Sequence, residues 1–404
     1  MKSVGVIVEY NPFHNGHAFH IAQSKKAANA EIVIAAMSGN FLQRGEPALV
    51  SKWTRSQMAL MAGVDLVFEL PFQFATQQAE IFANGGVSIL SEAGCDAICF
   101  GSEDGNINAF EQANLTLQTN ETVFNERVKE YISEGVSYPK ALSLAFGTLT
   151  SEKNTVDMSK PNNILGFYYV KAAQNQRNRP NMLTISRQNA DYHDEHFGSD
   201  SIASATSIRS SLFSNNQELD QIKPYLPHSS LASLLEYKKV YGGFHHWEQY
   251  WPYLKYKLLQ SNPEELRTLH GVEEGIENRL LSNVLKAESF VDFINRVKTK
   301  RYTWTRLQRM CLHILTNSKK VEMQLTSDRA PYLRLLGMTE KGRSYLNKNK
   351  QHFNIPLISK LSSYKGTEID LDIRTSRIYA LGVKNYSQEL LIQEFNQKPI
   401  YIEK

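Results

Sequence analysis

The sequence has 404 residues, of which 42% are hydrophobic and 21% charged, and this composition excludes a disordered chain. No apolar stretch approaches the ~18 residues that a membrane-spanning helix needs, and no basic segment leads into an apolar run, so we expect a cytoplasmic protein without membrane contact. The formal net charge of +4 is too small to indicate nucleic-acid binding by itself.

Short apolar, β-rich runs alternate with helical patterns through the first half of the chain. We predict strands at residues 4–8, 32–37, 66–70, 97–100 and 182–185, and helices at about 17–28, 53–62, 77–91 and 163–174. This alternation predicts the α/β class, with a Rossmann-like, doubly wound parallel sheet. Such sheets bind ligands beyond the carboxyl ends of their strands, so functional residues are expected in 9–17, 38–44, 71–74, 101–104 and 186–188.

The character of the sequence changes at residues 223–230, where KPYLPHSS carries two prolines and no clear periodicity. Beyond it, the spacing of apolar residues predicts helices at 231–240, 247–259, 272–285, 289–297, 302–315 and 332–336. We therefore predict two domains. Residues 1–225 would form the sheet domain, and residues 226–404 a mainly α-helical C-terminal domain.

Three histidines follow the first predicted strand closely, in EYNPFHNGHAFH at residues 9–20. His14-Asn15-Gly16-His17 would open the first helix, which brings both imidazoles and several free backbone N–H groups to a helix N-terminus, where phosphate binds well. Gly16 would let a phosphate approach the backbone without meeting a Cβ atom. His20, one turn further on, could equally pack in the core or face solvent.

A second element with phosphate-binding character is SATSIRSS at residues 204–211. Its small hydroxyl residues can cap a helix and donate to phosphate, and Arg209 can grip two phosphate oxygens. His14, His17 and Arg209 are the candidate catalytic residues, because fixed donors stabilise the charge that builds up during attack on phosphorus. The two elements resemble the signatures of the nucleotidyltransferase superfamily, whose members attack the α-phosphate of a nucleoside triphosphate and release pyrophosphate.

Longer segments of the sequence narrow the resemblance from the superfamily to one family. GVIVEYNPFHNGH, SGNFLQRGEPALVSKWTRSQMAL, FGSE, PNNILGFYYVKA and ASATSIRSSL are similar to the bacterial tRNA(Met) cytidine acetate ligase family. The resemblance implies an enzyme that uses ATP, with Mg²⁺ expected on the triphosphate, to convert acetate into acetyl-adenylate. The acetyl group would then pass to the wobble cytidine in the anticodon loop of elongator tRNA(Met), giving N(4)-acetylcytidine.

The same resemblance assigns the residues that would bind ATP. They are Ile7, Val8, Glu9, Tyr10, Asn11, His14, Asn15, Gly16, His17, His20, Gly101, Asn162, Arg187, Thr206 and Ser207. Gly101 could instead only form a turn, and Asn162 only cap the following helix. Lys52 and Arg55, near the start of the second predicted helix, could hold the triphosphate or the tRNA, or lie on a solvated helix end.

The basic stretch at residues 296–306 is where tRNA would bind. Cations there would neutralise phosphates, and an aromatic ring could stack on an unpaired base. Alternatively, the aromatic residues belong to the core and the cations to a hydrated helix face. The candidate tRNA-binding residues are Lys298, Lys300, Arg301, Tyr302, Trp304 and Arg306.

Two other functions are open to this sequence. One is a nucleotidyltransferase that adenylylates or cytidylylates a small phosphorylated metabolite and does not depend on tRNA. The other is a non-catalytic tRNA-binding protein with a vestigial nucleotide pocket, against which the intact His14, His17 and Arg209 argue. The sequence points to no general base for the attack of the cytidine amine.

Overall fold

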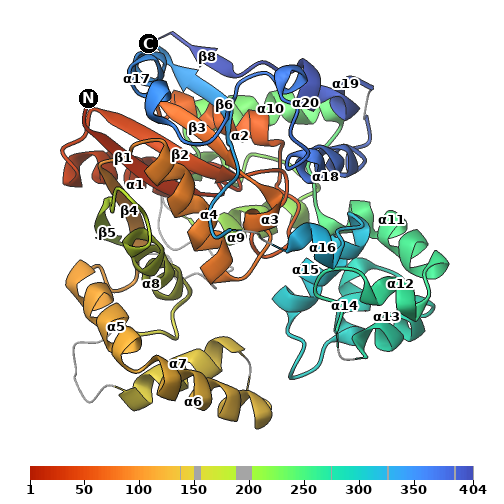
Figure 1. Cartoon of the computed structure of the whole chain (residues 1–404). Helices are drawn as coiled ribbons and strands as arrows, with labels where there is room; N and C mark the ends of the chain where they lie inside the picture. Colours follow the sequence, from red (N-terminus) through yellow and green to blue (C-terminus); the bar gives the residue numbers. More distant parts are fainter. Residues whose placement is uncertain are drawn as a thin grey trace.

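The computed structural model describes residues 1–136, 138–149, 156–187, 203–273, 275–324, 327–385 and 388–403, and these contain one eight-stranded sheet (Figure 1). The strand order is β5-β4-β1-β2-β3-β6-β7, with β8 beside β6. Strands β1 to β5 pair parallel with one another, which confirms the doubly wound parallel sheet predicted from the sequence. The strands are β1 (Ser3–Val8), β2 (Ile32–Ser38), β3 (Leu66–Leu70), β4 (Ala97–Ser102), β5 (Asn181–Ser186), β6 (Leu333–Thr339), β7 (Leu357–Ile358) and β8 (Ile400–Ile402).

Helices cover both faces of the sheet, and alternate residues of each strand enter different cores. In β2, Ile32, Ile34 and Ala36 pack into one core, whereas Val33 and the residues alternating with it pack into the other. Burial on both faces explains why the strands are apolar almost without interruption. The first core is closed by α4 (Ala79–Glu92) and α8 (Pro161–Gln174), and the second by α1 (Asn15–Ala27), α2 (Lys52–Met61) and α10 (His228–Tyr241).

Two groups of helices extend from the sheet as lobes in the lower part of Figure 1. The first lobe lies between β4 and α8 in the sequence, and the second, which has its own hydrophobic core, follows α10. Among the described residues, no helix is both long and apolar enough to cross a lipid bilayer. The first lobe comprises α5 (Ile107–Thr119), α6 (Glu121–Ser133) and α7 (Tyr138–Leu149); the second comprises α11 (Trp247–Gln260), α12 (Pro263–Arg267), α13 (Ile276–Val284), α14 (Phe290–Val297), α15 (Trp304–Leu315) and α16 (Lys320–Met323).

The C-terminal part of the chain returns to the sheet, which the sequence analysis did not expect. The prediction of a helix at residues 332–336 is wrong, because this segment begins strand β6, which pairs antiparallel with β3. A short apolar run fits both the helical and the strand spacing of apolar residues. Here the segment forms a strand because it pairs with the edge of β3. The division at residue 225 stays a prediction. The remaining α-helices are α3 (Phe72–Ala75), α9 (Ala205–Ser214), α17 (Glu340–Asn349), α18 (Asp370–Ala380), α19 (Gln388–Leu391) and α20 (Gln393–Asn396).

Candidate functional site

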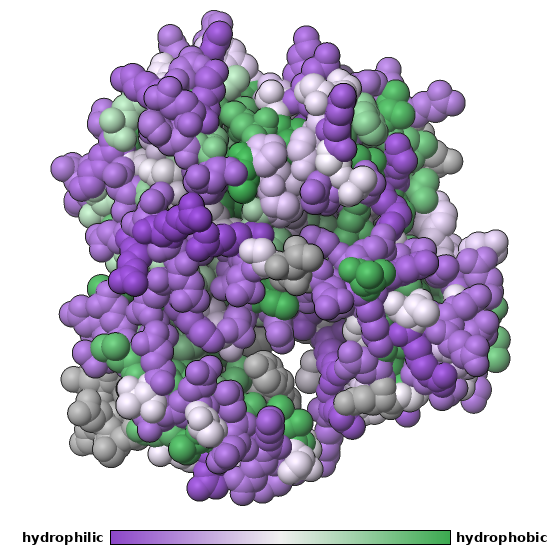
Figure 2. Space-filling view, viewed as in Figure 1, coloured by the Kyte–Doolittle hydropathy of each residue, from purple (hydrophilic) through white to green (hydrophobic). Residues whose placement is uncertain are grey.

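A cavity of about 1600 Å³ lies at the carboxyl ends of β1, β4 and β5. The chain leaves β1 toward β2 and leaves β4 toward β5, in opposite directions along the sheet, so the crevice between β1 and β4 is the topological switch point where such sheets bind ligands. Small-molecule sites usually occupy roughly 300–1,000 Å³, so this cavity has room for more than one nucleotide. Figure 2 shows an opening between the two helical lobes in the lower part of the view.

His14 and His17 lie side by side at the start of α1, with ring centroids 3.8 Å apart. His14 is the N-cap residue, and its Nδ1 accepts a hydrogen bond from the N–H of Gly16 at 3.1 Å. The Nδ1 of His17 accepts from the N–H of His14 at 3.3 Å. Because Nδ1 accepts in both rings, the proton of each neutral imidazole is on Nε2, which is therefore a hydrogen-bond donor.

The imidazoles of this site are neutral at physiological pH. Burial and the nearby Arg187 and Arg209 lower the pKa of His14 to about 3, and burial and Arg187 lower the pKa of His20 to about 4. Burial and the adjacent His14 hold the pKa of His17 well below its ordinary value. The histidines therefore act as neutral donors, and positive charge for a phosphate ligand comes from the arginines.

The lowered pKa of His14 predicts that the protein is less stable in acid. With a folded-state pKa of about 3, below the unfolded value of about 6.5, the unfolded state binds more protons between these two values. The contribution of His14 is therefore complete above pH 6.5, and about 2 kcal/mol of it is lost between pH 7 and pH 5. Urea unfolding of wild type and His14→Asn at both pH values should show the smaller acid loss in the variant. An equal loss in both proteins would contradict the assignment.

Arg209 lies beside this pair of histidines although it is distant in the sequence. It projects from α9, whose N-cap Ser204 accepts a hydrogen bond from the N–H of Ser207 at 3.0 Å. Its Nη1 donates to the carbonyl of Asn11 at 2.8 Å, and its Nη2 pairs with Glu46 at 2.9 Å. The two sequence elements with phosphate-binding character therefore meet at one wall of the cavity.

A second polar group lies where β4 and β5 end. Nη1 of Arg187 donates to Oδ1 of Asn162 at 3.2 Å, and Nδ2 of Asn162 donates to Glu103 at 2.7 Å. Asn162 therefore does not cap α8, whose N-cap residue is Lys160. A Cβ built on Gly101 would meet its nearest neighbour, Arg187, at 3.5 Å, an ordinary contact. Gly101 lines the cavity, so its backbone is exposed to a ligand there.

Most of the residues predicted to bind ATP line this single cavity, and two do not. Nδ2 of Asn15 donates to the carbonyl of Pro224 at 3.0 Å, and the hydroxyl of Ser207 is buried and donates to the carbonyl of Ser204 at 2.9 Å. Residue 188 of the predicted segment 186–188 lies outside the described residues. The predicted residues that line the cavity are Ile7, Val8, Glu9, Tyr10, Asn11, His14, Gly16, His17, His20, Gly101, Asn162, Arg187, Thr206 and Arg209.

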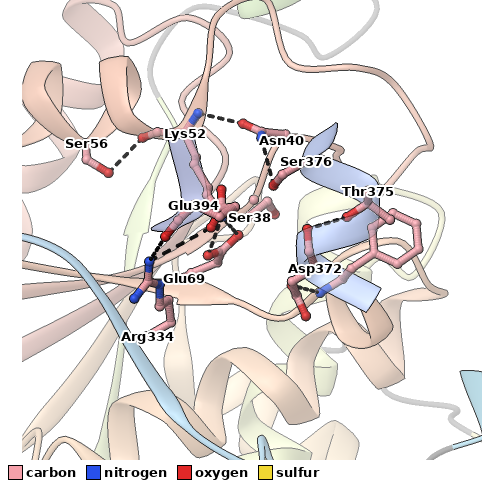
Figure 3. Close-up of polar contacts among 12 residues, drawn as sticks. Ser38, Asn40, Lys52, Ser56, Glu69, Arg334, Asp372, Thr375, Ser376 and Glu394 are labelled. Atoms are coloured by element: carbon pink, nitrogen blue, oxygen red, sulfur yellow. Dashed lines mark hydrogen bonds and ion pairs between the residues drawn. The ribbon is translucent and has the colours of Figure 1, made fainter. Parts of the chain in front are cut away.

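Lys52 and Arg55 are structural residues, which corrects all the alternatives that the sequence left open for them. Both are fully buried. Nζ of Lys52 lies 2.7 Å from Glu69 and 2.8 Å from Glu394 (Figure 3). The guanidinium of Arg55 donates to the carbonyls of Glu9 at 2.6 Å and Ser38 at 3.1 Å, and so ties together the carboxyl ends of β1 and β2. Neither cation can reach a ligand in the cavity.

Two residues of the predicted basic stretch, Arg301 and Arg306, line the cavity. Lys298 and Lys300 are exposed and are not among the lining residues. Tyr302 belongs to the core of the second lobe: it is 6% exposed, and its hydroxyl donates to the carbonyl of Glu273 at 2.8 Å.

Trp304 is half-buried against the same core, and its Nε1 donates to Gln308 at 3.1 Å. For the two aromatic residues, the structure therefore favours the alternative of a packing role. The guanidinium of Arg306 covers the ring of Tyr302 at 4.4 Å, which leaves that face of the ring unavailable to a base.

Positive charge is concentrated around the cavity. Seven cationic side chains and three carboxylates line it, an excess of four that equals the formal net charge of the whole chain. Such a local excess of positive charge attracts polyanions. The net charge of the whole chain did not indicate where the positive charge is concentrated. Arg44 and Lys129 were not singled out in the sequence, although Arg44 falls in the predicted strand-end segment 38–44. The cations are Arg44, Lys129, Arg187, Arg209, Arg301, Arg306 and Arg309, and the carboxylates are Glu9, Glu46 and Glu80.

The fold and the cavity define a nucleotidyltransferase-type protein, and the family model described as HIGH Nucleotidyl Transferase matches residues 1–394. The chain is 46% identical to the tRNA(Met) cytidine acetate ligase of Bacillus subtilis (strain 168) over 99% of this chain and 97% of the relative. It is 50% identical to that of Geobacillus sp. (strain WCH70) over 90% of both chains. The chain belongs to the tRNA(Met) cytidine acetate ligase family, as the sequence resemblance predicted.

Solved structures agree with this assignment. Thermotoga maritima TmcAL in its apo form superposes with a TM-score of 0.92 at 31% identity, and the match covers all of both chains. The same protein bound with alpha-thio ATP gives a TM-score of 0.91 at 30% identity, again over all of both chains.

Proposed function

We propose that this protein is an ATP-dependent ligase that activates acetate as acetyl-adenylate, releases pyrophosphate, and transfers the acetyl group to the wobble cytidine of elongator tRNA(Met). One observation carries the proposal: the His14–His17–Arg209 group and the arginines of the second lobe face a single cavity. A nucleotide-activating site and a surface suited to RNA phosphates are thereby brought together. The names of the relatives and the ATP analogue bound to the Thermotoga protein support it.

In the first step, an acetate oxygen attacks the α-phosphorus of ATP and pyrophosphate leaves. The Nε2–H groups of His14 and His17 and the guanidinium of Arg209 would donate to the phosphate oxygens as negative charge builds on them. Mg²⁺ would enter with ATP as part of the substrate. Triphosphate oxygens and water would be among its ligands.

In the second step, the cytidine amine attacks the acetyl group of the adenylate. The anticodon loop would bind against Arg301, Arg306 and Arg309, and the wobble cytosine would leave its stack to enter the cavity. Unstacking is inexpensive in an anticodon loop, because its bases are not held in a duplex. The mixed anhydride is already activated, so no covalent protein intermediate is needed. The reaction would take place in the cytoplasm, where tRNA is available.

The test is to follow both steps with purified protein. We expect ATP–pyrophosphate exchange that depends on acetate, and incorporation of labelled acetate into elongator tRNA(Met) as N(4)-acetylcytidine, detected by nucleoside mass spectrometry. A transcript with uridine at the wobble position is the matched control and should stay unlabelled. Exchange that ignores acetate and delivers a nucleotide to a small phosphorylated molecule would establish the metabolite transferase instead. Binding of tRNA without any exchange would indicate the non-catalytic alternative.

A further inference from the structure

Three carboxylates line the cavity, and they differ in their partners. Glu46 is paired with Arg209 at 2.9 Å, and Glu80 is paired with Lys171 at 2.7 Å. Glu9 accepts a hydrogen bond on Oε1 from the N–H of Gln43 at 2.7 Å, and within the described part of the chain its Oε2 has no hydrogen-bond partner and no cation at ion-pair distance. One carboxylate oxygen of Glu9 is therefore available to a ligand in the cavity.

The backbone around Glu9 is held firmly. Glu9 directly follows β1, at the switch point of the sheet, and its carbonyl accepts from Arg55 at 2.6 Å. The Gln43 N–H fixes the side chain from the other end. A carboxylate held in this way has little freedom to lose when it acts on a substrate, which favours catalysis.

The charge of Glu9 suits proton transfer better than phosphate binding. A carboxylate next to a triphosphate repels it, whereas the attack of an amine on an acyl group requires an acceptor for the amine proton. The histidines of the cavity are poor acceptors, because the pKa values of His14 and His20 are about 3 and about 4.

Burial makes Glu9 a better acceptor than an ordinary carboxylate. Burial raises the pKa of Glu9. The hydrogen bond from the Gln43 N–H lowers it, Glu46 raises it, and Arg44 and Arg55 lower it. Tyr169 on α8 also lines the cavity, and burial and the charge of Glu9 raise the pKa of its phenol. A raised pKa brings a carboxylate closer to the pH at which it must accept a proton.

We propose that Glu9 is the general base of acetyl transfer and accepts the proton that the cytidine amine loses. The proposal rests on the proposed function. The amine nitrogen forms a bond to the carbonyl carbon of acetyl-adenylate, and the bond between that carbon and the phosphate oxygen breaks. AMP leaves with the electron pair of that bond. The amine proton passes to Oε2 of Glu9 and from there to solvent.

Glu9→Gln tests this role, because the amide oxygen can still accept from Gln43 while the side chain can no longer take a proton. We expect acetate-dependent ATP–pyrophosphate exchange within about threefold of wild type, which also shows that the variant folds. Transfer from preformed acetyl-adenylate to tRNA should slow by about 10²–10⁴-fold. The wild-type transfer rate should fall in acid as Glu9 becomes protonated, and this dependence should disappear in the variant. Glu9→Asp should restore part of the rate. Glu236→Gln should leave both steps unchanged, because Glu236 is exposed on α10 and does not line the cavity.

Two results would overturn the assignment: an equal loss of exchange and transfer in Glu9→Gln, or transfer at the wild-type rate. Both are distinct from failure of the proposed function, in which wild type itself shows no exchange with acetate or no transfer to tRNA.

Discussion

Replacing His17 with asparagine should slow acetyl-adenylate formation by about 10²–10³-fold, the usual effect of removing one donor that stabilises transition-state charge. The asparagine Oδ1 can still accept the His14 N–H that Nδ1 of His17 accepts at 3.3 Å, so the start of α1 is preserved. What disappears is the Nε2–H donor. The loss should appear mainly in kcat rather than in KM for ATP, because the donor acts most strongly on the charge of the transition state.

Acetate-dependent ATP–pyrophosphate exchange measures this effect directly. His14→Asn should behave similarly, since asparagine is also a good N-cap residue and can accept the N–H of Gly16. His228→Asn is the matched control, because His228 is exposed at the start of α10 and does not line the cavity. A His17→Asn protein with a wild-type thermal transition and a wild-type exchange rate would remove His17 from the catalytic site.

Replacing Lys52 with methionine should lower the free energy of unfolding by about 3–5 kcal/mol. It leaves the buried carboxylate of Glu69 without its cation and that of Glu394 with only Arg334, at 4.0 Å. Glu69 belongs to β3 and Glu394 to α20, so Lys52 joins the carboxyl end of β3 to the C-terminal segment (Figure 3). Burial already raises the pKa of Glu69, and removal of Lys52 should raise it further.

Urea unfolding at two pH values checks this prediction. With a folded-state pKa above the unfolded value, a carboxyl group stabilises the protein at low pH and loses that contribution as pH rises. The defect of Lys52→Met should therefore be larger at pH 8 than at pH 6. Lys171→Met is the control: its pair with Glu80 is partly exposed, and its loss should cost at most about 1 kcal/mol. If Lys52→Met is no less stable than this control, Lys52 does not stabilise the fold through Glu69 and Glu394.

Local patterns were enough to predict the parallel sheet and the place of the HNGH segment. The strand Leu66–Leu70 was predicted to the residue, and the helix that follows β1 begins within two residues of the predicted start. These features depend on the spacing of apolar residues within a few turns or strand positions, which the sequence displays directly. The short Tyr332–Leu336 run carries too few residues to distinguish a strand from a helix, and only its pairing with β3 decided it.

Which side chains are buried, and which residues they pair with, depended on segments far apart in the chain. From the sequence, Lys52 could be a surface cation. In the structure it is buried and paired with Glu394, more than 300 residues later in the chain. From the sequence, Tyr302 could stack on a base. In the structure its ring packs in the core of the second lobe and its hydroxyl donates to the carbonyl of Glu273. Glu46 and Glu80 are paired with cations from distant segments, whereas Glu9 is half-buried and accepts a hydrogen bond from the N–H of Gln43.

The residue types and spacings in this chain thus specify its secondary structure and the chemistry of its motifs, because both arise from interactions between near neighbours. Which polar groups face the cavity, which are neutralised in the interior and which keep a free atom for a substrate depend on contacts between distant segments. Those contacts exist only in the folded molecule.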